Sequence, residues 1–209
     1  MRLLSVAASG AMTWLTTATV LQKLRDFDNR EAWESFADRF RQPVVSFARS
    51  MGLPPVDAED VAQETLLAFA EAYRKGNYDP SKGRLSRFLF GIAYRQSLRA
   101  RRQREQQGGL TVRLPSGGSG VWAEIPDEET ASGIWDTEWE RCALERCLQQ
   151  ARSEFEPETF RAFELTVREE MTPAETARRL GIPVKSVYNA KHRVLKRIRE
   201  LREAFESHE

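Results

Sequence analysis

The sequence predicts an all-α protein with two small helical domains joined by a flexible linker. Apolar residues recur at three- and four-residue spacing through most of the chain, as on one face of a helix, and no stretch alternates as a strand does. Turn-forming residues gather in the middle of the chain, at Gly108, Gly109, Pro115, Gly117, Gly118 and Gly120. We therefore predict an N-terminal extension at 1–19, helical domains at 20–105 and 136–205, and a flexible, acidic linker at 106–135.

Charge is divided along the chain, although the formal net charge is only +1. One basic cluster contains Arg95, Arg99, Arg101, Arg102 and Arg104, and a second runs from Lys185 to Arg202. The segment between them is acidic and contains Glu124, Asp127, Glu128, Glu129, Asp136, Glu138 and Glu140. Two basic clusters separated by an acidic connector indicate two contacts with a polyanion and a linker that stays away from it.

The sequence offers no constellation for catalysis, metal binding or membrane insertion. It has no Gly-rich phosphate loop, no paired carboxylates in a catalytic context and no nucleophile beside a base, so we expect no catalytic residue and no cofactor. Cys142 and Cys147 are five residues apart on a predicted helix, which disfavours a disulfide or a shared metal. The apolar run after Arg2 is short and interrupted, so we expect a cytoplasmic protein without a membrane span.

The helices of the first domain have recognisable beginnings. Asp28 and Glu31 have the spacing of a capping box, and the aromatic residues Trp33, Phe36 and Phe40 follow on one helical face. We expect Pro43 to interrupt this helix and Asp57 to cap the next one. The inward face of that next helix is predicted to consist of Val61, Leu66, Phe69 and Tyr73.

The other face of this second helix is acidic. It presents Asp60, Gln63, Glu64 and Glu71, with Leu67 exposed among them. An acidic face beside a basic nucleic-acid-binding region suits a protein partner, although a merely solvated face is the simpler alternative.

A basic, turn-rich loop at 75–84 precedes a helix in which aromatic residues alternate with arginines. Phe90, Tyr94 and the arginines are expected outside a core of Leu85, Phe88, Leu89, Ile92 and Ala93. Exposed aromatics among arginines suit single-stranded nucleic acid, because bases stack on rings while guanidinium groups hold phosphates. Alternatively, Phe90 and Tyr94 complete a helical core.

Residues 171–202 predict a helix-turn-helix. Thr172 and Glu175 form a capping box around Pro173, and Gly181 ends the first helix. The predicted buried positions are Ala174, Ala177 and Leu180 in the first helix, and Val187, Ala190 or the stem of Lys191, Val194 and Ile198 in the second. The basic second helix is expected in the DNA major groove, and an ordinary helical hairpin with a solvated basic face is the alternative.

Three segments, in this order, resemble a bacterial RNA polymerase sigma factor of the sigma-70 superfamily, of the compact extracytoplasmic-function (ECF) type. DAEDVAQETLLAFAEAY resembles the helix that binds the clamp helices of the polymerase β′ subunit. GRLSRFLFGIAYRQSLRARRQR resembles the segment that melts and reads the minus-ten element. MTPAETARRLGIPVKSVYNAKHRVLKRIRE resembles the helix-turn-helix that reads the minus-thirty-five element. The resemblance covers roughly residues 20–105 and 136–203, and it implies domains similar to sigma regions 2 and 4.

The resemblance also implies residue roles by position. It assigns polymerase docking to Asp60, Gln63, Glu64 and Leu67. It assigns contacts with the minus-ten element to Asn77, Tyr78, Lys82, Arg84, Arg87, Tyr94, Arg95, Arg99 and Arg102. It assigns contacts with the minus-thirty-five element to Lys185, Ser186, Tyr188, Asn189, His192, Arg193 and Lys196. The chain departs from the family at Phe88, which is usually Trp, and at Arg95 and Arg99, which are often Asn and Asp.

The partners that the resemblance implies are core RNA polymerase, through its β′ clamp helices and β flap, and promoter DNA in double- and single-stranded form; an anti-sigma factor is a further candidate. We therefore hypothesise a non-enzymatic transcription initiation factor that reads both promoter elements and assists strand opening. The main alternative is an autonomous helix-turn-helix regulator that binds duplex DNA without polymerase. A protein-only adaptor would show no salt-dependent DNA binding, and a nucleic-acid enzyme lacks a catalytic constellation.

Overall fold

The computed structural model describes residues 21–106 and 126–206, and the regular secondary structure of these residues is entirely helical. The helices are α2 (Arg30–Ser50), α3 (Pro55–Arg74), α4 (Leu85–Gln106), α5 (Glu128–Glu154), α6 (Pro157–Phe163), α7 (Pro173–Leu180) and α8 (Val184–Glu206), with a π-helical turn, η1 (Glu164–Arg168), after α6. The predicted all-α fold class is confirmed. In the described part of the chain, none of the helices is both long enough and apolar enough to cross a membrane.

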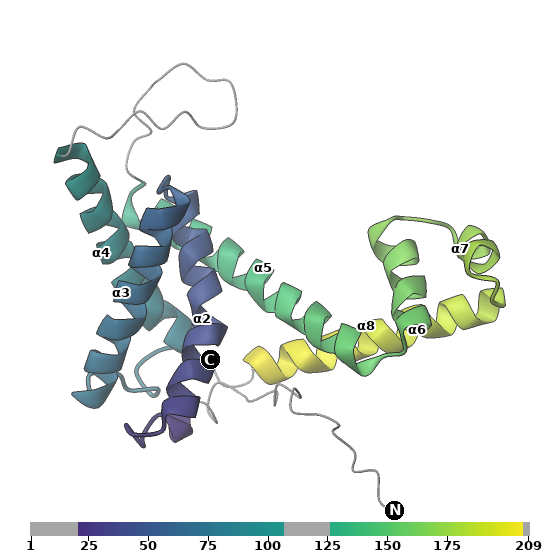
Figure 1. The fold of residues 1–209 in the computed structure, drawn as a ribbon, viewed down its shortest axis with the longest axis horizontal. Coiled ribbons are helices and arrows are strands. Elements are labelled where there is room, and N and C mark those ends of the chain that lie inside the picture. The colour runs from purple at the N-terminus through teal and green to yellow at the C-terminus, as the bar shows by residue number, and fades with distance from the viewer. Residues whose placement is uncertain (1–20, 107–125, 207–209) are drawn as a thin grey trace, which may run out of the picture.

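Helices α2, α3 and α4 form a bundle, and α5 leaves this bundle to reach the group formed by α6, α7 and α8 (Figure 1). Helix α8 then runs back along α5, so that its last turn approaches the bundle (Figure 1). At 27 residues, α5 is the longest helix described, and at 1.5 Å per residue it spans roughly 40 Å. It therefore serves as a rigid connection between the two helical groups.

The first hydrophobic core lies between α2, α3 and α4 and is rich in aromatic rings. Phe36, Phe40 and Phe69 are almost completely buried, and Phe36 stacks on Phe69 with ring centroids 4.6 Å apart. Helix α5 adds Trp135 and Trp139 to this same core. The expected linker at 106–135 therefore lies only partly outside the described residues (107–125), because its last eight residues form the first turns of α5.

The start of α5 has a local explanation. The Asp127 side chain accepts a hydrogen bond from the Thr130 N–H at 2.8 Å, and Glu128 and Glu129 occupy the first turn, where negative charge stabilises the helix dipole. The backbone hydrogen bond lowers the pKa of Asp127. Acidic residues that indicate a solvated connector in the sequence therefore begin a helix.

The second core lies between the end of α5, α6 and α8. Its buried residues are Cys147, Ala151, Phe160, Phe163, Val194, Ile198 and Leu201. Cys142 and Cys147 are both buried.

Three expected helix boundaries are wrong. Asn29, not Asp28, caps α2 by accepting a hydrogen bond from the Ala32 N–H at 3.0 Å. Helix α3 begins two residues before Asp57, at Pro55, whose missing N–H needs no partner in a first turn. Helix α2 also continues through Pro43, because the side chains on both sides of it are buried in the same core.

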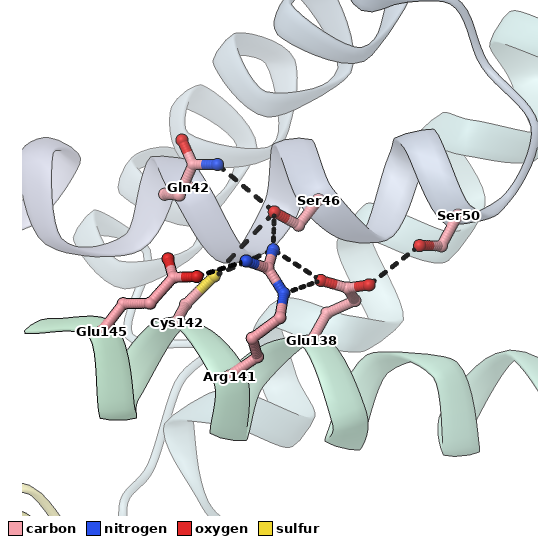
Figure 2. Close-up of polar contacts among 7 residues, drawn as sticks. All are labelled: Gln42, Ser46, Ser50, Glu138, Arg141, Cys142 and Glu145. Carbon is pink, nitrogen blue, oxygen red and sulfur yellow. Dashed lines mark hydrogen bonds and ion pairs between the residues drawn. The ribbon is translucent and has the colours of Figure 1, made fainter. Parts of the chain in front are cut away.

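A row of polar contacts joins α2 to the middle of α5 (Figure 2). The Arg141 guanidinium donates to Glu138, to Glu145 and, at 2.8 Å, to the Ser46 hydroxyl of α2. Glu138 in turn accepts a hydrogen bond from the Ser50 hydroxyl at 3.0 Å. We call Ser46, Ser50, Glu138 and Arg141 the polar seam; it fixes the side of α5 that faces the bundle.

Candidate nucleic-acid and protein interface

The helix-turn-helix forms as the sequence predicts. The Thr172 hydroxyl accepts from the Glu175 N–H at 3.3 Å and the Glu175 carboxylate accepts from the Thr172 N–H at 3.1 Å, which completes the capping box. Helix α7 ends at Gly181, which has φ +68° and therefore occupies the left-handed region that favours glycine. These local contacts orient α8 relative to α7.

The buried side of the helix-turn-helix follows the prediction with one correction. Val187, Ala190, Val194 and Ile198 of α8 are buried, as expected. In α7, however, Ala174 is exposed, while Thr176 and Ala177 are buried and Leu180 is half-buried. Thr176 and Leu180 are four residues apart and therefore lie on the same face of α7, beside Ala177. Ala174 is exposed because the first turn of this short helix does not pack against the protein.

All the predicted contacts with duplex DNA lie on the exposed side of α8. The exposed residues are Lys185, Ser186, Tyr188, Asn189, His192, Arg193 and Lys196. The large ring of Tyr188 is 59% exposed, so it contributes little to the packing of α8. Arg193 lies near a ring, with its guanidinium carbon 5.5 Å from the Phe155 centroid.

Arg197, on the same helix, has a structural role that sequence reasoning missed. Its guanidinium donates two hydrogen bonds to the Glu154 carboxylate, at 2.6 and 3.0 Å, and thus joins α8 to the end of α5. The hydrogen bonds from Arg197 lower the pKa of Glu154 and raise that of Arg197. Both groups therefore stay charged at neutral pH.

The arginines of α4 divide into exposed and structural residues. Arg95, Arg99 and Arg102 are exposed, consistent with a binding role. Arg101, in contrast, is buried and donates to the Met51 carbonyl at 2.9 Å, and Arg104 forms an ion pair with Asp57 at 2.7 Å. Arg101 thus ties α4 to the end of α2, and Arg104 ties it to the start of α3, which charge alone did not reveal.

The aromatic residues of this region are less exposed than expected. Phe90 is only 5% exposed, packed between Phe47, Tyr94 and Trp135, so its expected availability to nucleic acid is wrong. The reason is that α5 covers this side of α4. Tyr94 is half-buried and donates its hydroxyl proton to the Pro126 carbonyl at 3.1 Å.

The loop before α4 and the first turn of α4 present five of the nine predicted minus-ten residues. Asn77, Lys82, Arg84 and Arg87 are exposed, while Tyr78 is half-buried. The Tyr78 ring lies 5.1 Å from Phe88 and 6.0 Å from Phe69, centroid to centroid. Arg87 also donates a hydrogen bond to the Ser132 hydroxyl of α5.

Asp79 organises this loop and was not singled out by the sequence. Its carboxylate accepts hydrogen bonds from the Ser81 N–H at 2.9 Å and the Ser81 hydroxyl at 2.7 Å. These bonds lower the pKa of Asp79. The Asp-x-Ser spacing is the signal that could have predicted this turn.

The acidic face of α3 lies where the sequence placed it. Asp60, Gln63 and Glu64 are exposed, and Leu67 is 53% exposed. The other acidic residues of α3 form ion pairs: Asp57 with Arg104, Glu59 with Arg41, and Glu71 with Lys75. Within the described residues, Asp60 and Glu64 form no ion pair. Val56, one turn before Asp60, is an apolar neighbour that is 71% exposed.

Family comparisons agree with this arrangement. The family model of Sigma-70 region 2 matches residues 36–107, and that of Sigma-70, region 4 matches residues 145–198. The first match takes in α3, α4 and most of α2, the second the end of α5 and most of α8, and together they cover more than half of the chain. No curated protein matches the sequence significantly. Sigma-70 factors are non-catalytic initiation factors that bind promoter DNA, and this chain belongs to their family, as a factor of the extracytoplasmic-function type.

Proposed function

We propose that this protein binds core RNA polymerase and directs it to specific promoters by reading a minus-thirty-five and a minus-ten element. The observation that carries the proposal is the division of charge on α3. Three of its acidic residues are paired within the protein, whereas Asp60 and Glu64, which the resemblance assigns to polymerase docking, form no ion pair in the described residues. Exposed carboxylates without internal partners are available to a basic partner surface.

For polymerase docking we propose that Asp60, Gln63, Glu64 and Leu67 contact the β′ clamp helices. Leu67 supplies an exposed apolar anchor one turn after Glu64, and the carboxylates orient the bound partner.

The α7–α8 pair is proposed to contact the β flap. We further propose a cytoplasmic location without membrane insertion, and inactivation by an anti-sigma factor remains a further proposal.

For the minus-thirty-five element, α8 is proposed to enter the major groove. Lys185, Arg193 and Lys196 supply positive charge for phosphates and guanine edges, while Ser186, Asn189 and His192 offer shorter hydrogen-bonding groups for bases. The capping box and Gly181 hold α8 in the orientation that this contact requires.

For the minus-ten element, the loop at 75–84 and the exposed face of α4 are proposed to take the opened strand. Asn77, Lys82 and Arg84 are exposed in the loop that contains the half-buried Tyr78, and Arg87, Arg95 and Arg102 are exposed along α4. A base removed from the duplex loses stacking energy of about a few kcal/mol, which contacts in such a loop offset. Assisted strand opening then follows from preferential binding of the single strand.

The test is run-off transcription with purified bacterial core polymerase on promoters from the same genome. The wild-type protein is expected to produce discrete transcripts that core polymerase alone does not make. The double variant Asp60→Lys/Glu64→Lys should abolish them, because reversed charges repel a basic docking surface. Glu34→Lys is the matched control: Glu34 is exposed on α2, outside the proposed docking surface, and its ion pair with Arg30 is a solvent-exposed one of little energetic weight.

The result that would contradict the proposal is equally specific. If core polymerase gains no initiation while the protein alone binds duplex DNA at moderate salt, the protein is an autonomous helix-turn-helix regulator. Variant Lys185→Glu would then weaken this polymerase-free binding.

A further inference from the structure

A groove between α3 and α4 brings two predicted sites together. It has a volume of about 460 Å³. One wall carries Asp60, Gln63 and Glu64 from α3, and the other carries Gln96, Arg99 and Gln103 from α4. The resemblance to sigma factors assigns Asp60, Gln63 and Glu64 to polymerase docking and Arg99 to the minus-ten DNA. The groove therefore brings together residues that were expected to bind different partners.

The walls are held in place at one end. Asp57 and Arg104, which also line the groove, form an ion pair at 2.7 Å, and both side chains are about two-thirds or more buried. Three residues before Arg104, the buried Arg101 donates a hydrogen bond to the Met51 carbonyl at 2.9 Å. These contacts fix α4 against the end of α2 and the beginning of α3, so that the groove is present before any partner binds.

The charges farther along the groove are not satisfied within the described part of the chain. Asp60 and Glu64 on one wall form no ion pair there, and Arg99 on the other forms none either, although they line the same groove. If Arg99 formed an ion pair with Asp60 or Glu64 across the groove, few charged groups would be left for a partner to bind. Opposite charges held on separate walls instead match a ligand that carries both signs.

The groove chemistry favours a polypeptide over DNA. A phosphate placed against Arg99 would lie in the same groove as the carboxylates of Asp60 and Glu64, which repel it. A protein segment with a basic side chain toward α3 and an acidic one toward α4 satisfies both walls. The three glutamine amides of the groove each donate and accept hydrogen bonds, as the polar groups of a polypeptide require.

We propose that Arg99, with Gln96 and Gln103, belongs to the polymerase-docking surface and not to the minus-ten DNA surface. The occupant of the groove is a segment of core polymerase that presents basic residues to Asp60 and Glu64 and an acidic residue to Arg99. This inference rests on the proposed polymerase binding and extends the docking surface from α3 to α4.

The experiment measures the affinity of the full-length protein for core polymerase in the absence of DNA. Arg99→Glu is expected to weaken this affinity about tenfold, as Asp60→Lys does, because each reversal places like charges across the interface. Arg99→Ala should cause a smaller loss in the same direction. Arg49→Glu is the matched control, because Arg49 is exposed on α2 and does not line the groove. The affinity of this variant for core polymerase should stay within about twofold of wild type.

Thermal melting of each variant accompanies the affinity measurement. Arg99 is exposed and forms no ion pair with the described residues, so Arg99→Glu should melt within about 2 °C of wild type. A loss of affinity with unchanged melting therefore supports the assignment of Arg99 to the docking surface.

Two other outcomes separate this inference from the proposed function. If Asp60→Lys weakens core binding but both Arg99 variants bind core normally and instead bind single-stranded minus-ten DNA more weakly, Arg99 is a DNA contact and the inference is overturned. If the wild-type protein does not bind core polymerase, the proposed function itself fails.

Discussion

The guanidinium carbon of Arg39 lies 4.4 Å from the centroid of the Phe205 ring, so the last turn of α8 meets the middle of α2. Phe205 is only 4% exposed and also contacts Trp139, with centroids 6.1 Å apart. Helix α8 therefore has the residues proposed to contact DNA at one end, while its other end is anchored in the core of the α2–α4 bundle. This contact joins the proposed DNA-binding helix to the region 2 domain.

Replacing Phe205 by alanine should loosen this anchor. The loss of buried aromatic surface and of the cation–π contact is expected to reduce the free energy of unfolding by about 3 kcal/mol. Urea denaturation followed by circular dichroism measures the change. The neighbouring Glu203→Ala, at an exposed position, serves as control and should have an effect below about 0.5 kcal/mol. Equal stability of the two variants would show that the last turn of α8 is not anchored.

Removal of the Arg141 side chain should weaken the polar seam between α2 and α5. Arg141→Ala leaves the Ser46 hydroxyl and the Glu138 and Glu145 carboxylates without their shared donor. Because Arg141 is partly exposed, we expect a modest loss of about 1 kcal/mol. Hydrogen exchange of the α5 amides should accelerate in this variant. Arg141→Lys should restore only part of the protection, since an ammonium group cannot reproduce the planar set of donors.

The capping box of α7 should matter for the recognition helix. Thr172→Ala removes the side-chain acceptor for the Glu175 N–H and should lower the free energy of unfolding by about 1 kcal/mol. Thr172→Ser keeps the hydroxyl and should stay near wild type. Thermal melting of the full-length variants provides the comparison, and a Thr172→Ala protein as stable as the serine variant would contradict a stabilising role of the cap.

The Glu154–Arg197 pair predicts a defined pH dependence. The pKa of Glu154 in the folded protein is lowered below its ordinary value of 4.5, chiefly by the hydrogen bond from Arg197. A lowered carboxyl pKa contributes stability that is fully present above the unfolded-state pKa and is lost as the pH falls through the folded-state pKa. The difference in unfolding free energy between wild type and Glu154→Gln should therefore be constant near neutral pH and shrink below about pH 4.5.

Urea denaturation of both proteins between pH 3 and pH 7 measures this difference. We expect about 0.5–1 kcal/mol at neutral pH, because the pair is partly exposed and screened by solvent. A difference that does not change with pH would show that the stabilisation by Glu154 does not depend on its charge.

The recognition unit could be predicted from the sequence because its determinants are local. The capping partners Thr172 and Glu175 are three residues apart, Gly181 supplies the left-handed turn, and the buried residues of α8 recur at helical spacing. The exposed set from Lys185 to Lys196 then follows from the burial of Val187, Ala190 and Val194 alone. The exposure of Asp60 and Glu64 follows in the same way from the buried Val61 and Phe69.

Contacts between distant segments decided the rest. Helical spacing marks Trp135 and Trp139 as buried residues, but only packing places them in the first core. Phe90 is covered because α5 crosses α4, and α2 continues through Pro43 because its neighbours on both sides are buried. Local patterns report the conformation and the buried side of each helix, since hydrogen bonds and apolar spacing act within a few residues. Which helix covers which face, and which arginine finds a partner, depends on residues far apart in the chain, and therefore only the tertiary structure decided it.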